Sequence, residues 1–357
     1  MTRLLLVCIF LLTASVAFAQ LTSTAQRLRL ARSTYEQGRL HELPDLLAEI
    51  IKSGDKSQKV EAYELLTQAY IYLEEPEKAD EAMLNLLRTD PYYRPNPDVA
   101  PAELIALYKT FRTKPIYRLG VKFSLNATQP NVKSYNQVSD GNASYTYKLG
   151  FGGGFVGEIP LDLPILKDRF TFNPEVYFST RSFTNTSNSV LNGETYSTTT
   201  GTEKQSWLSV PLLLQYQIIR VDEFKKQPKF IERLNPFINF GIAGDYLLSA
   251  STDVDQKRVG NQSIDVRTAT IDTQREKINL SAVLGGGIKT RIAGGYLVAE
   301  VRYYYGLSKV NSSSTLLSNQ VLLNDYKLVD GIFNMNSLFV NVGYVQNFFN
   351  PKKLKRK

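Results

Sequence analysis

The sequence predicts a two-domain protein, an N-terminal α-helical repeat domain followed by a C-terminal eight-stranded antiparallel transmembrane β-barrel. Three observations support this fold class. Apolar residues recur at helical spacing from Leu21 to about Arg112, and at every second position in segments from Ile116 onward. The connections between those segments alternate between long and short, as they do in outer-membrane barrels. With 357 residues the chain is long enough for both domains.

Residues 1–19 are expected to be a secretory signal peptide. A positive start, an apolar core and a small-residue cleavage site follow one another at Met1-Thr2-Arg3, Leu4 to Val16 and Ala17-Phe18-Ala19. Cleavage is expected before Gln20. Cys8, the only cysteine of the chain, lies within this segment. The mature chain would then have no thiol, which excludes disulfides, cysteine-ligated zinc and cysteine nucleophiles.

Residues 20–113 are expected to form a periplasmic helical domain. Apolar positions follow the i, i+3, i+4, i+7 spacing of an amphipathic helix, as at Ala62, Leu65, Leu66 and Ala69. Three residue pairs are each separated by 35 positions: Tyr35 and Tyr70, Asp45 and Asp80, Ile51 and Leu86. This spacing is similar to that of tetratricopeptide repeats, and the stretch resembles two such helix pairs. The resemblance implies a surface that binds a protein or peptide. The alternative is a plain helical bundle without a partner.

The clearest strand candidate runs from Ser206 to Ile218. Its even positions from Leu208 onward are all apolar, whereas its odd positions include Ser209 and Gln217. Successive side chains of a strand point to opposite faces, so one face is apolar and the other is mixed. Seven further segments repeat the pattern, and the eight are centred on residues 119–126, 148–158, 170–178, 206–218, 238–246, 278–289, 297–303 and 338–344.

The connections predict how the barrel is oriented. Those after strands one, three, five and seven are longer and polar, at about 128–143, 185–203, 250–274 and 309–334. Outer-membrane barrels have long external loops and short periplasmic turns. An even strand number returns both ends of the barrel, residues 116–350, to one side. The helical domain and the basic tail, residues 351–357, are therefore expected in the periplasm of a Gram-negative bacterium.

Composition excludes some functions. The net charge is +8 and the pI is near 9.2, but Lys and Arg are dispersed except at the C-terminal end. A basic stripe interleaved with stacking aromatics is absent, so nucleic-acid binding is not expected. The chain has 21 Tyr and 18 Phe but 1 Trp, which suits aromatic girdles at the two membrane interfaces. The expected surroundings of the barrel are outer-membrane lipids.

Segments within residues 116–350 resemble the PorT-like outer-membrane β-barrel family of Bacteroidota-type bacteria. The similar segments, in order, are LSVPLLL at 208–214, NPFINFG at 235–241, GGG at 285–287, VAEVRYYYGL at 298–307 and FVNVGY at 339–344. The resemblance implies an eight-stranded barrel with no catalytic residues, and a role in type IX secretion. Two features depart from the family. The helical domain is not part of it, and the aromatic end of the barrel is followed by a basic tail.

The sequence provides little for catalysis or for a cofactor. The single histidine, His41, lies in the helical part and is expected on a helix surface. The barrel therefore has neither a Ser-His-Asp triad nor a histidine-ligated metal. The glycines of residues 150–154 are not followed by the Gly-Lys-Ser/Thr of a phosphate loop. They are expected to allow curvature or to relieve crowding in the barrel interior. No cofactor and no metal are expected.

Charged residues at polar strand positions are the candidate functional site. If the strands align, acids and bases would face each other in the interior at Lys122, Lys148, Glu158, Glu175, Asp245, Lys289, Glu300 and Arg302. Eight strands leave room for side chains and little else, so a wide pore is not expected. The main interpretation is a compensated ionic plug that stabilises the barrel. The alternative is a pair of carboxylates in a hydrolytic site.

Three functions follow in order of preference. The first is a non-enzymatic outer-membrane protein, whose barrel anchors a periplasmic module that binds another envelope protein through residues 20–113. The second is a component of a secretion or envelope-assembly machinery, acting through the barrel itself. The third is a membrane enzyme, in which substitution of Glu175 or Glu300 would abolish activity. The identity of the partner, the ligands of the loops and the oligomeric state do not follow from the sequence.

Overall fold

The chain forms two compact units in a computed structural model. Met1–Pro115 and Phe349–Lys357 make the helical unit, and Ile116–Phe348 make the barrel unit. The predicted signal peptide, including Cys8, lies outside the described residues. The structure describes residues 24–135, 143–161, 169–191, 193–219, 234–258, 262–292, 294–312, 314–326 and 328–354.

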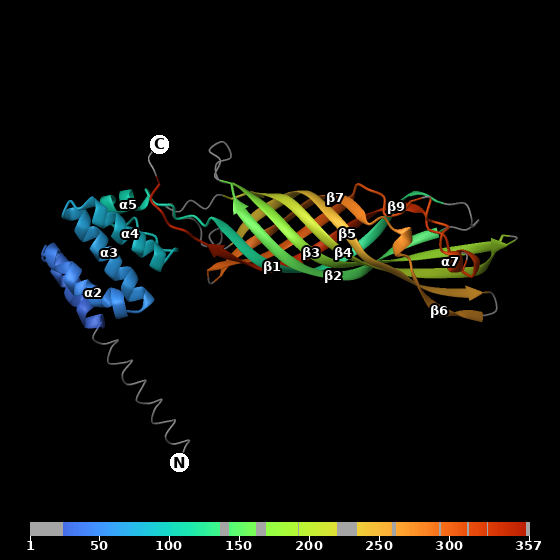
Figure 1. The fold of residues 1–357 in the computed structure, drawn as a ribbon, viewed down its shortest axis with the longest axis horizontal. Coiled ribbons are helices and arrows are strands. Elements are labelled where there is room, and N and C mark those ends of the chain that lie inside the picture. Colours follow the sequence, from blue (N-terminus) through green and yellow to red (C-terminus); the bar gives the residue numbers. More distant parts are fainter. Residues whose placement is uncertain are drawn as a thin grey trace, which may run out of the picture. The chain divides into compact units, whose positions relative to one another are not determined.

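The helical unit begins with a helix at 24–36 and continues with short helices joined by tight turns (Figure 1). Asp55 starts α3 with a capping box, in which its carboxylate accepts from Gln58 N and the Gln58 side chain accepts from Asp55 N. Pro76, which cannot donate a backbone hydrogen bond, is the first residue of α4. The elements are η1 (Leu40–Glu42), α2 (Leu43–Ser53), α3 (Lys56–Tyr72), α4 (Pro76–Thr89) and α5 (Ala102–Tyr108).

Two of these helices end in the same way. After the helix at 24–36, Gly38 has a φ of 76°, and after α3, Glu74 has a φ of 57°. In both turns this residue and the next donate backbone hydrogen bonds to carbonyls three and five residues earlier, the pattern of a Schellman motif. Glycine adopts a positive φ without strain, whereas glutamate does so at a cost. Among the described residues Glu74 is the one non-glycine with a positive φ.

The end of the chain is part of the helical unit. The backbone N–H of Arg112 donates to Lys352 O (2.9 Å), and Leu354 N donates to Thr110 O (2.8 Å). Phe111 and Lys353 form the antiparallel bridge between these bonds. The last barrel strand ends at Phe348, so the structure groups the residues from Phe349 onward with the helices. The sequence placed the end of the barrel at residue 350.

Eight strands close the barrel, which confirms the predicted strand number. Each strand is antiparallel to its neighbours in the order β1-β2-β3-β4-β5-β7-β8-β9, and β9 pairs with β1 (Figure 1). β6 is an additional strand outside this closed order, and it pairs only with β5, over Ser251–Arg258. The strands are β1 (Tyr117–Ser134), β2 (Ala143–Pro160), β3 (Phe170–Leu191), β4 (Glu194–Gln217), β5 (Leu234–Arg258), β6 (Gln262–Thr270), β7 (Ile278–Ile292), β8 (Gly295–Gly306) and β9 (Ile332–Phe348).

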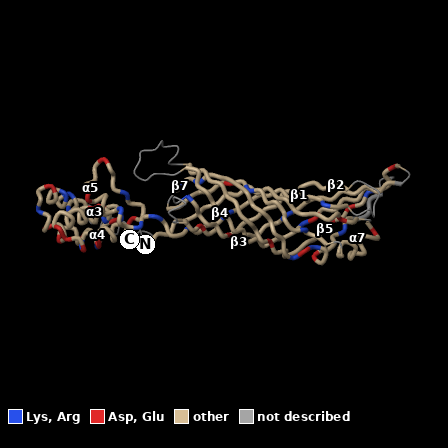
Figure 2. The backbone as a smooth tube through the Cα atoms, turned by 90° about the horizontal axis from the view of Figure 1, so that it is seen from above, with Lys and Arg blue, Asp and Glu red and all other residues tan. Residues whose placement is uncertain are grey.

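The predicted two-faced pattern is present in β4. From Ser197 to Gln215 its odd residues are buried, and from Leu208 to Leu212 its even residues are exposed. The exterior forms an apolar band, with Phe123 69% and Phe155 73% exposed. Such a band suits lipid contact and would be unfavourable in water. In Figure 2 the middle of the barrel is mostly tan, and charged residues gather toward the end at which α7 lies.

Two of the four predicted long loops, at 185–203 and 250–274, are wrong, and the one at 128–143 is wrong over residues 128–134. Residues 136–142 of that predicted loop lie outside the described residues. Residues 185–203 form the continuation of β3 and β4, joined by a tight turn in which Gly193 has a φ of 84°. Residues 128–134 extend β1, and the segment 250–274 contains the end of β5 and all of β6. These stretches are rich in Thr and Ser, which are common in loops, and for that reason the sequence predicted loops there. β-branched threonines also suit strands, and here they face one another across the β3–β4 ladder.

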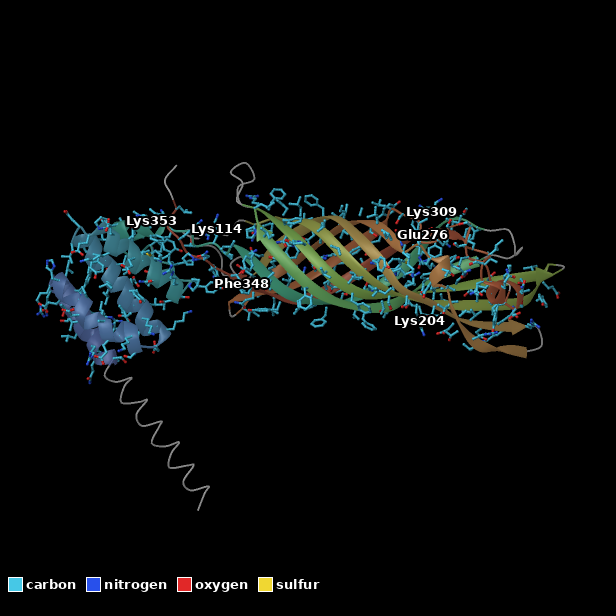
Figure 3. The ribbon with its side chains drawn as sticks, in the orientation of Figure 1. Lys114, Lys204, Glu276, Lys309, Phe348 and Lys353 are labelled. Carbon is cyan, nitrogen blue, oxygen red and sulfur yellow. The ribbon has the colours of Figure 1, made fainter. Side chains whose placement is uncertain are left out.

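The connection at 307–331, which contains α7 (Gln320–Asn324), fills the end of the barrel opposite Phe348 (Figure 3). Leu322 and Tyr326 pack in one apolar cluster with the inward-facing Phe183 and Trp207 of the wall. The carbonyl of Tyr326 accepts hydrogen bonds from side chains of β4 and β5. This connection is therefore a plug packed into the barrel.

No helix among the described residues is both long and apolar enough to cross a membrane.

Candidate functional site

Seven of the eight predicted interior charges are buried in the barrel: Lys122, Glu158, Glu175, Asp245, Lys289, Glu300 and Arg302. Lys148 is the exception, because its side chain is exposed. A register shift separates Lys148 from Gly152 in the β2–β3 pairing. Such a β-bulge reverses the alternation of side chains along the strand. Glu158 lies on one side of the bulge and faces inward, whereas Lys148 lies on the other and faces outward.

Glu175 is the centre of the largest ion-pair cluster. One of its oxygens accepts from Lys122 Nζ at 2.9 Å, and Arg302 donates to both oxygens at 2.6 and 2.7 Å. Glu300 accepts from Lys122 Nζ (2.8 Å) and from Asn239 (2.8 Å), and its carboxylate is 2.7 Å from Arg302. Two cations and two carboxylates from three strands, β1, β3 and β8, therefore neutralise one another, and each is at most 3% exposed.

A second cluster lies nearer the end of the barrel at which Tyr117 and Phe348 pair. Lys289 Nζ donates to Glu158 at 2.6 Å, and Arg118 donates to the other oxygen of Glu158 at 3.1 Å. Arg118 also donates to the side chain of Asn347 at 2.9 Å. β1, β2, β7 and β9 are thus tied together across the interior.

Arg181 and Asp245 form a third cluster, and the sequence analysis missed Arg181. Its two terminal nitrogens donate to the two oxygens of Asp245 at 3.1 and 3.0 Å, the two-pronged geometry that arginine makes with carboxylates. The guanidinium also lies 5.4 Å from the ring of Trp207. Continuing the inward alternation of β3 from Glu175 would have identified Arg181.

A fourth cluster, also missed, joins the plug to the wall. Arg275 donates to Glu203 of β4 at 2.7 and 2.6 Å, and to Asp330 of the plug at 2.5 Å. Asn185 of β3 donates to the other oxygen of Asp330 at 2.9 Å. The odd-residue alternation of β4 could have identified Glu203. No pattern in the sequence could have paired Arg275 with Asp330, because both lie in connections.

Glycines make room for the buried charges. In the strand register Gly343 is opposite Lys122, and Gly287 is opposite Glu300. A Cβ added to Gly343 would lie 2.6 Å from Lys122 Cγ, and one added to Gly287 would lie 2.6 Å from Glu300 Cβ. Larger residues would therefore displace the charged side chains. The sequence predicted such relief of crowding for the glycines of residues 150–154, where a Cβ added to Gly152 would lie 2.8 Å from Ser124 Oγ.

Apolar layers separate the ionic clusters. Along β5 the inward residues alternate in character: Phe237 is in one apolar cluster, Asn239 binds Glu300, Ala243 is in a second apolar cluster, Asp245 binds Arg181, and Leu247 packs on the plug. Side chains from all eight strands thus fill the barrel. Beside Arg275 a cavity of about 20 Å³ remains, which is room for about one water molecule.

Taken together, the four clusters are balanced in charge, because the second has one extra cation and the fourth has one extra carboxylate. The described ion pairs join six cations, Arg118, Lys122, Arg181, Arg275, Lys289 and Arg302, to six carboxylates, Glu158, Glu175, Glu203, Asp245, Glu300 and Asp330. Each carboxylate accepts from a cation. Carboxylates paired with cations in this way act as structural ties, unlike the two carboxylates of a catalytic pair, which are placed against each other.

Perturbed groups also occur in the helical unit. Burial raises the pKa of the Glu64 carboxyl, and the nearby Tyr93 hydroxyl lowers it in part. Burial also raises the pKa of Tyr35 to about 12. His41 is exposed in η1, as expected, and among the described residues no group of three or more His, Cys, Asp or Glu could hold a metal ion.

Solved structures of several outer-membrane proteins are similar to part of this chain at low sequence identity. Among curated proteins none matches this sequence. Neisserial surface protein A is similar at 11% identity over 64% of this chain and 97% of its own, with a TM-score of 0.32. OprG from Pseudomonas aeruginosa is similar at 10% identity over 66% and 98%, with a TM-score of 0.31. The outer membrane protease OmpT from Escherichia coli is similar at 8% identity over 65% and 97%, with a TM-score of 0.29.

One family model matches the sequence itself. It describes an outer membrane protein beta-barrel domain, and it matches residues 116–312, more than half of the chain. This assignment places the barrel in an outer membrane, with the exposed apolar band against lipid. The chain therefore belongs to the outer membrane protein beta-barrel domain family.

Proposed function

We propose that this chain is a non-enzymatic outer-membrane protein whose barrel anchors a periplasmic helical module that binds another envelope protein. The filled barrel interior is the observation that carries this proposal. Four ion-pair clusters, whose charges balance in sum, and the apolar layers between them occupy the space that a channel would need. A barrel that neither conducts nor exposes a reactive carboxylate is suited to anchoring.

The helical unit supports the interaction role. The 35-residue spacing of the sequence relates the helix at 24–36 to α3 and relates α2 to α4. The two helix pairs are the helix at 24–36 with α2, and α3 with α4. The first helix of each pair ends in the same Schellman turn. We propose that the pairs are tetratricopeptide-like. Such repeats stack into extended surfaces that bind proteins or peptides.

The topology of the barrel supports the proposed periplasmic placement of the helical unit. Tyr117 and Phe348 pair with each other, so the barrel chain enters and leaves at the same end. At that end β7 finishes at Ile292 and β8 starts at Gly295, and so short a separation in sequence is typical of periplasmic turns. The plug lies at the other end. Both polypeptide segments of the helical unit would therefore emerge on the periplasmic side.

The experiment is in-cell crosslinking followed by purification from outer membranes. Full-length protein is compared with a form that lacks residues 24–113, after protease resistance has shown that both barrels are folded in the membrane. Partners lost with the deletion support anchoring. Partners retained by the barrel alone would instead favour a component of a secretion or assembly machinery, as the PorT-like resemblance implies. Recovery of the full-length protein from the soluble periplasm would refute the proposal.

The closed interior has its own test. Purified protein in a planar lipid bilayer should give no stepwise conductance. Steady open-channel currents from the parent protein would show that the clusters do not close the barrel, and would contradict the anchoring proposal.

A further inference from the structure

The helical unit contains a groove of about 760 Å³, within the size range of ligand sites. Its apolar floor includes Ile71 of α3, Ala79 of α4, and Ala106 and Leu107 of α5. The C-terminal segment provides one wall, where Leu354 remains 48% exposed although it is apolar. Apolar side chains left open to water at the edge of a groove are typical of sites that bind a partner.

The charges around this groove are predominantly negative. Glu74, Glu75, Asp80 and Glu103 line it, against one cation, Lys353. Lys353 is paired with Asp80. The second oxygen of Asp80, Oδ1, is buried and has no hydrogen-bond partner among the described residues. Glu74 and Glu103 both line the groove and are exposed, so a cation bound in the groove would be attracted by both.

We propose that this groove binds an extended peptide segment of a partner protein that carries lysine or arginine next to an aliphatic side chain. The basic group would lie between the carboxylates of Glu74 and Glu103, and the aliphatic group would cover Ile71, Leu107 and Leu354. This assignment rests on the proposed function, and it names the chemistry of the partner. It uses charge complementarity at the rim and apolar contact at the floor, the usual arrangement of peptide grooves.

The C-terminal segment is part of the site. Leu354 and Lys353 reach the groove because the backbone bonds to Thr110 and Arg112 hold the segment against the end of α5. A chain that ends after Pro351 would lose one wall of the groove while keeping the barrel and the helices.

The test is fluorescence anisotropy on full-length protein in detergent, with two labelled octapeptides as probes. One alternates lysine and leucine, and the other alternates glutamate and leucine. The protein should bind the lysine peptide and not the glutamate peptide, and binding should weaken as salt is raised. The Glu74→Lys/Glu103→Lys variant should bind at least tenfold more weakly, and Ala106→Trp, which fills the floor, should do the same.

The matched control is Glu36→Lys/Glu81→Lys, which makes the same change of net charge at exposed positions outside the groove. It should bind the lysine peptide within twofold of the parent. If the control loses as much affinity for the lysine peptide as Glu74→Lys/Glu103→Lys does, the attraction is nonspecific and the proposal is overturned. Equal affinity of the parent protein for both peptides would overturn it as well. A tenfold gain on removal of residues 355–357 would make the chain's own end the occupant and would also overturn it.

Failure of the groove can be distinguished from failure of the proposed function. If the lysine peptide does not bind but residues 24–113 still determine which envelope proteins are crosslinked, the groove is wrong and the anchoring function stands. If the lysine peptide binds as described but crosslinked partners are unaffected by the deletion, the groove is a site and the anchoring function is wrong.

Discussion

Neutralising Glu175 should destabilise the barrel more than any comparable change at its surface. Glu175→Gln removes the charge that Lys122 and both prongs of Arg302 contact at 2.6 to 2.9 Å. Both cations would then depend on Glu300 alone. Breaking a buried ion pair from one side costs roughly 3–5 kcal/mol. An attraction of about 4 kcal/mol for charges about 4 Å apart at an effective dielectric of 20 agrees with this range.

The same reasoning predicts a rescue. Lys122→Met combined with Glu175→Gln leaves Arg302 paired with Glu300, so the interior is neutral again. Replacing a buried ion pair by uncharged groups is often close to neutral in stability. The double variant should therefore recover at least half of the loss, which is about 2 kcal/mol relative to Glu175→Gln alone.

The assay is equilibrium urea unfolding in lipid vesicles, followed by tryptophan fluorescence. Trp207 is the only tryptophan of the chain and is fully buried inside the barrel, so its emission reports barrel unfolding. Glu194→Gln, at an exposed carboxylate at the start of β4, is the control and should change stability by less than about 0.5 kcal/mol. A Glu175→Gln barrel as stable as this control would refute the ion-pair reasoning. A double variant as unstable as the single one would assign the loss to packing.

Three further predictions concern other parts of the molecule. Glu74→Gly should stabilise the helical unit by up to about 1 kcal/mol, measured by thermal melting of its helical circular dichroism, because glycine relieves the positive φ; a lower melting temperature would contradict this. Asp330→Asn weakens the bond of the plug to Arg275, so plug amides should exchange hydrogen roughly tenfold faster while exchange in β9 is unchanged. Equal exchange rates of the plug amides in Asp330→Asn and in the parent would show that apolar packing alone holds the plug. Burial raises the pKa of Glu64 in the folded state, so the folded state binds the proton more tightly and the helical unit loses stability as pH rises above the ordinary value of 4.5. Glu64→Gln should flatten this pH dependence and raise the neutral-pH melting temperature, and an unchanged pH profile would contradict the assignment.

Alternation along single strands was enough to identify most of the barrel wall. The apolar even positions of β4 predicted its lipid face, and the same period identified seven buried charges on the opposite face. The prediction that Lys148 faces inward was wrong because a β-bulge reverses the alternation of side chains. The extra residue of a bulge is visible only in the pairing of the strand with its neighbour. The Thr- and Ser-rich hairpin of β3 and β4 was wrongly predicted as a loop, for another reason. Its residues suit both loops and strands, and cross-strand pairing decided between them.

The sequence by itself determined the class of the protein, because lipid imposes a period of two on every membrane strand and that period can be read locally. It also determined the helical character of the first third of the chain. Only the tertiary structure decided which acid meets which base, since Arg275 and Asp330 are brought together by the closure of the barrel and the folding of the plug. It likewise decided that the chain's end completes the helical unit. The hydrogen bonds from Leu354 N to Thr110 O and from Arg112 N to Lys352 O span more than 200 residues of sequence, and no local pattern encodes them.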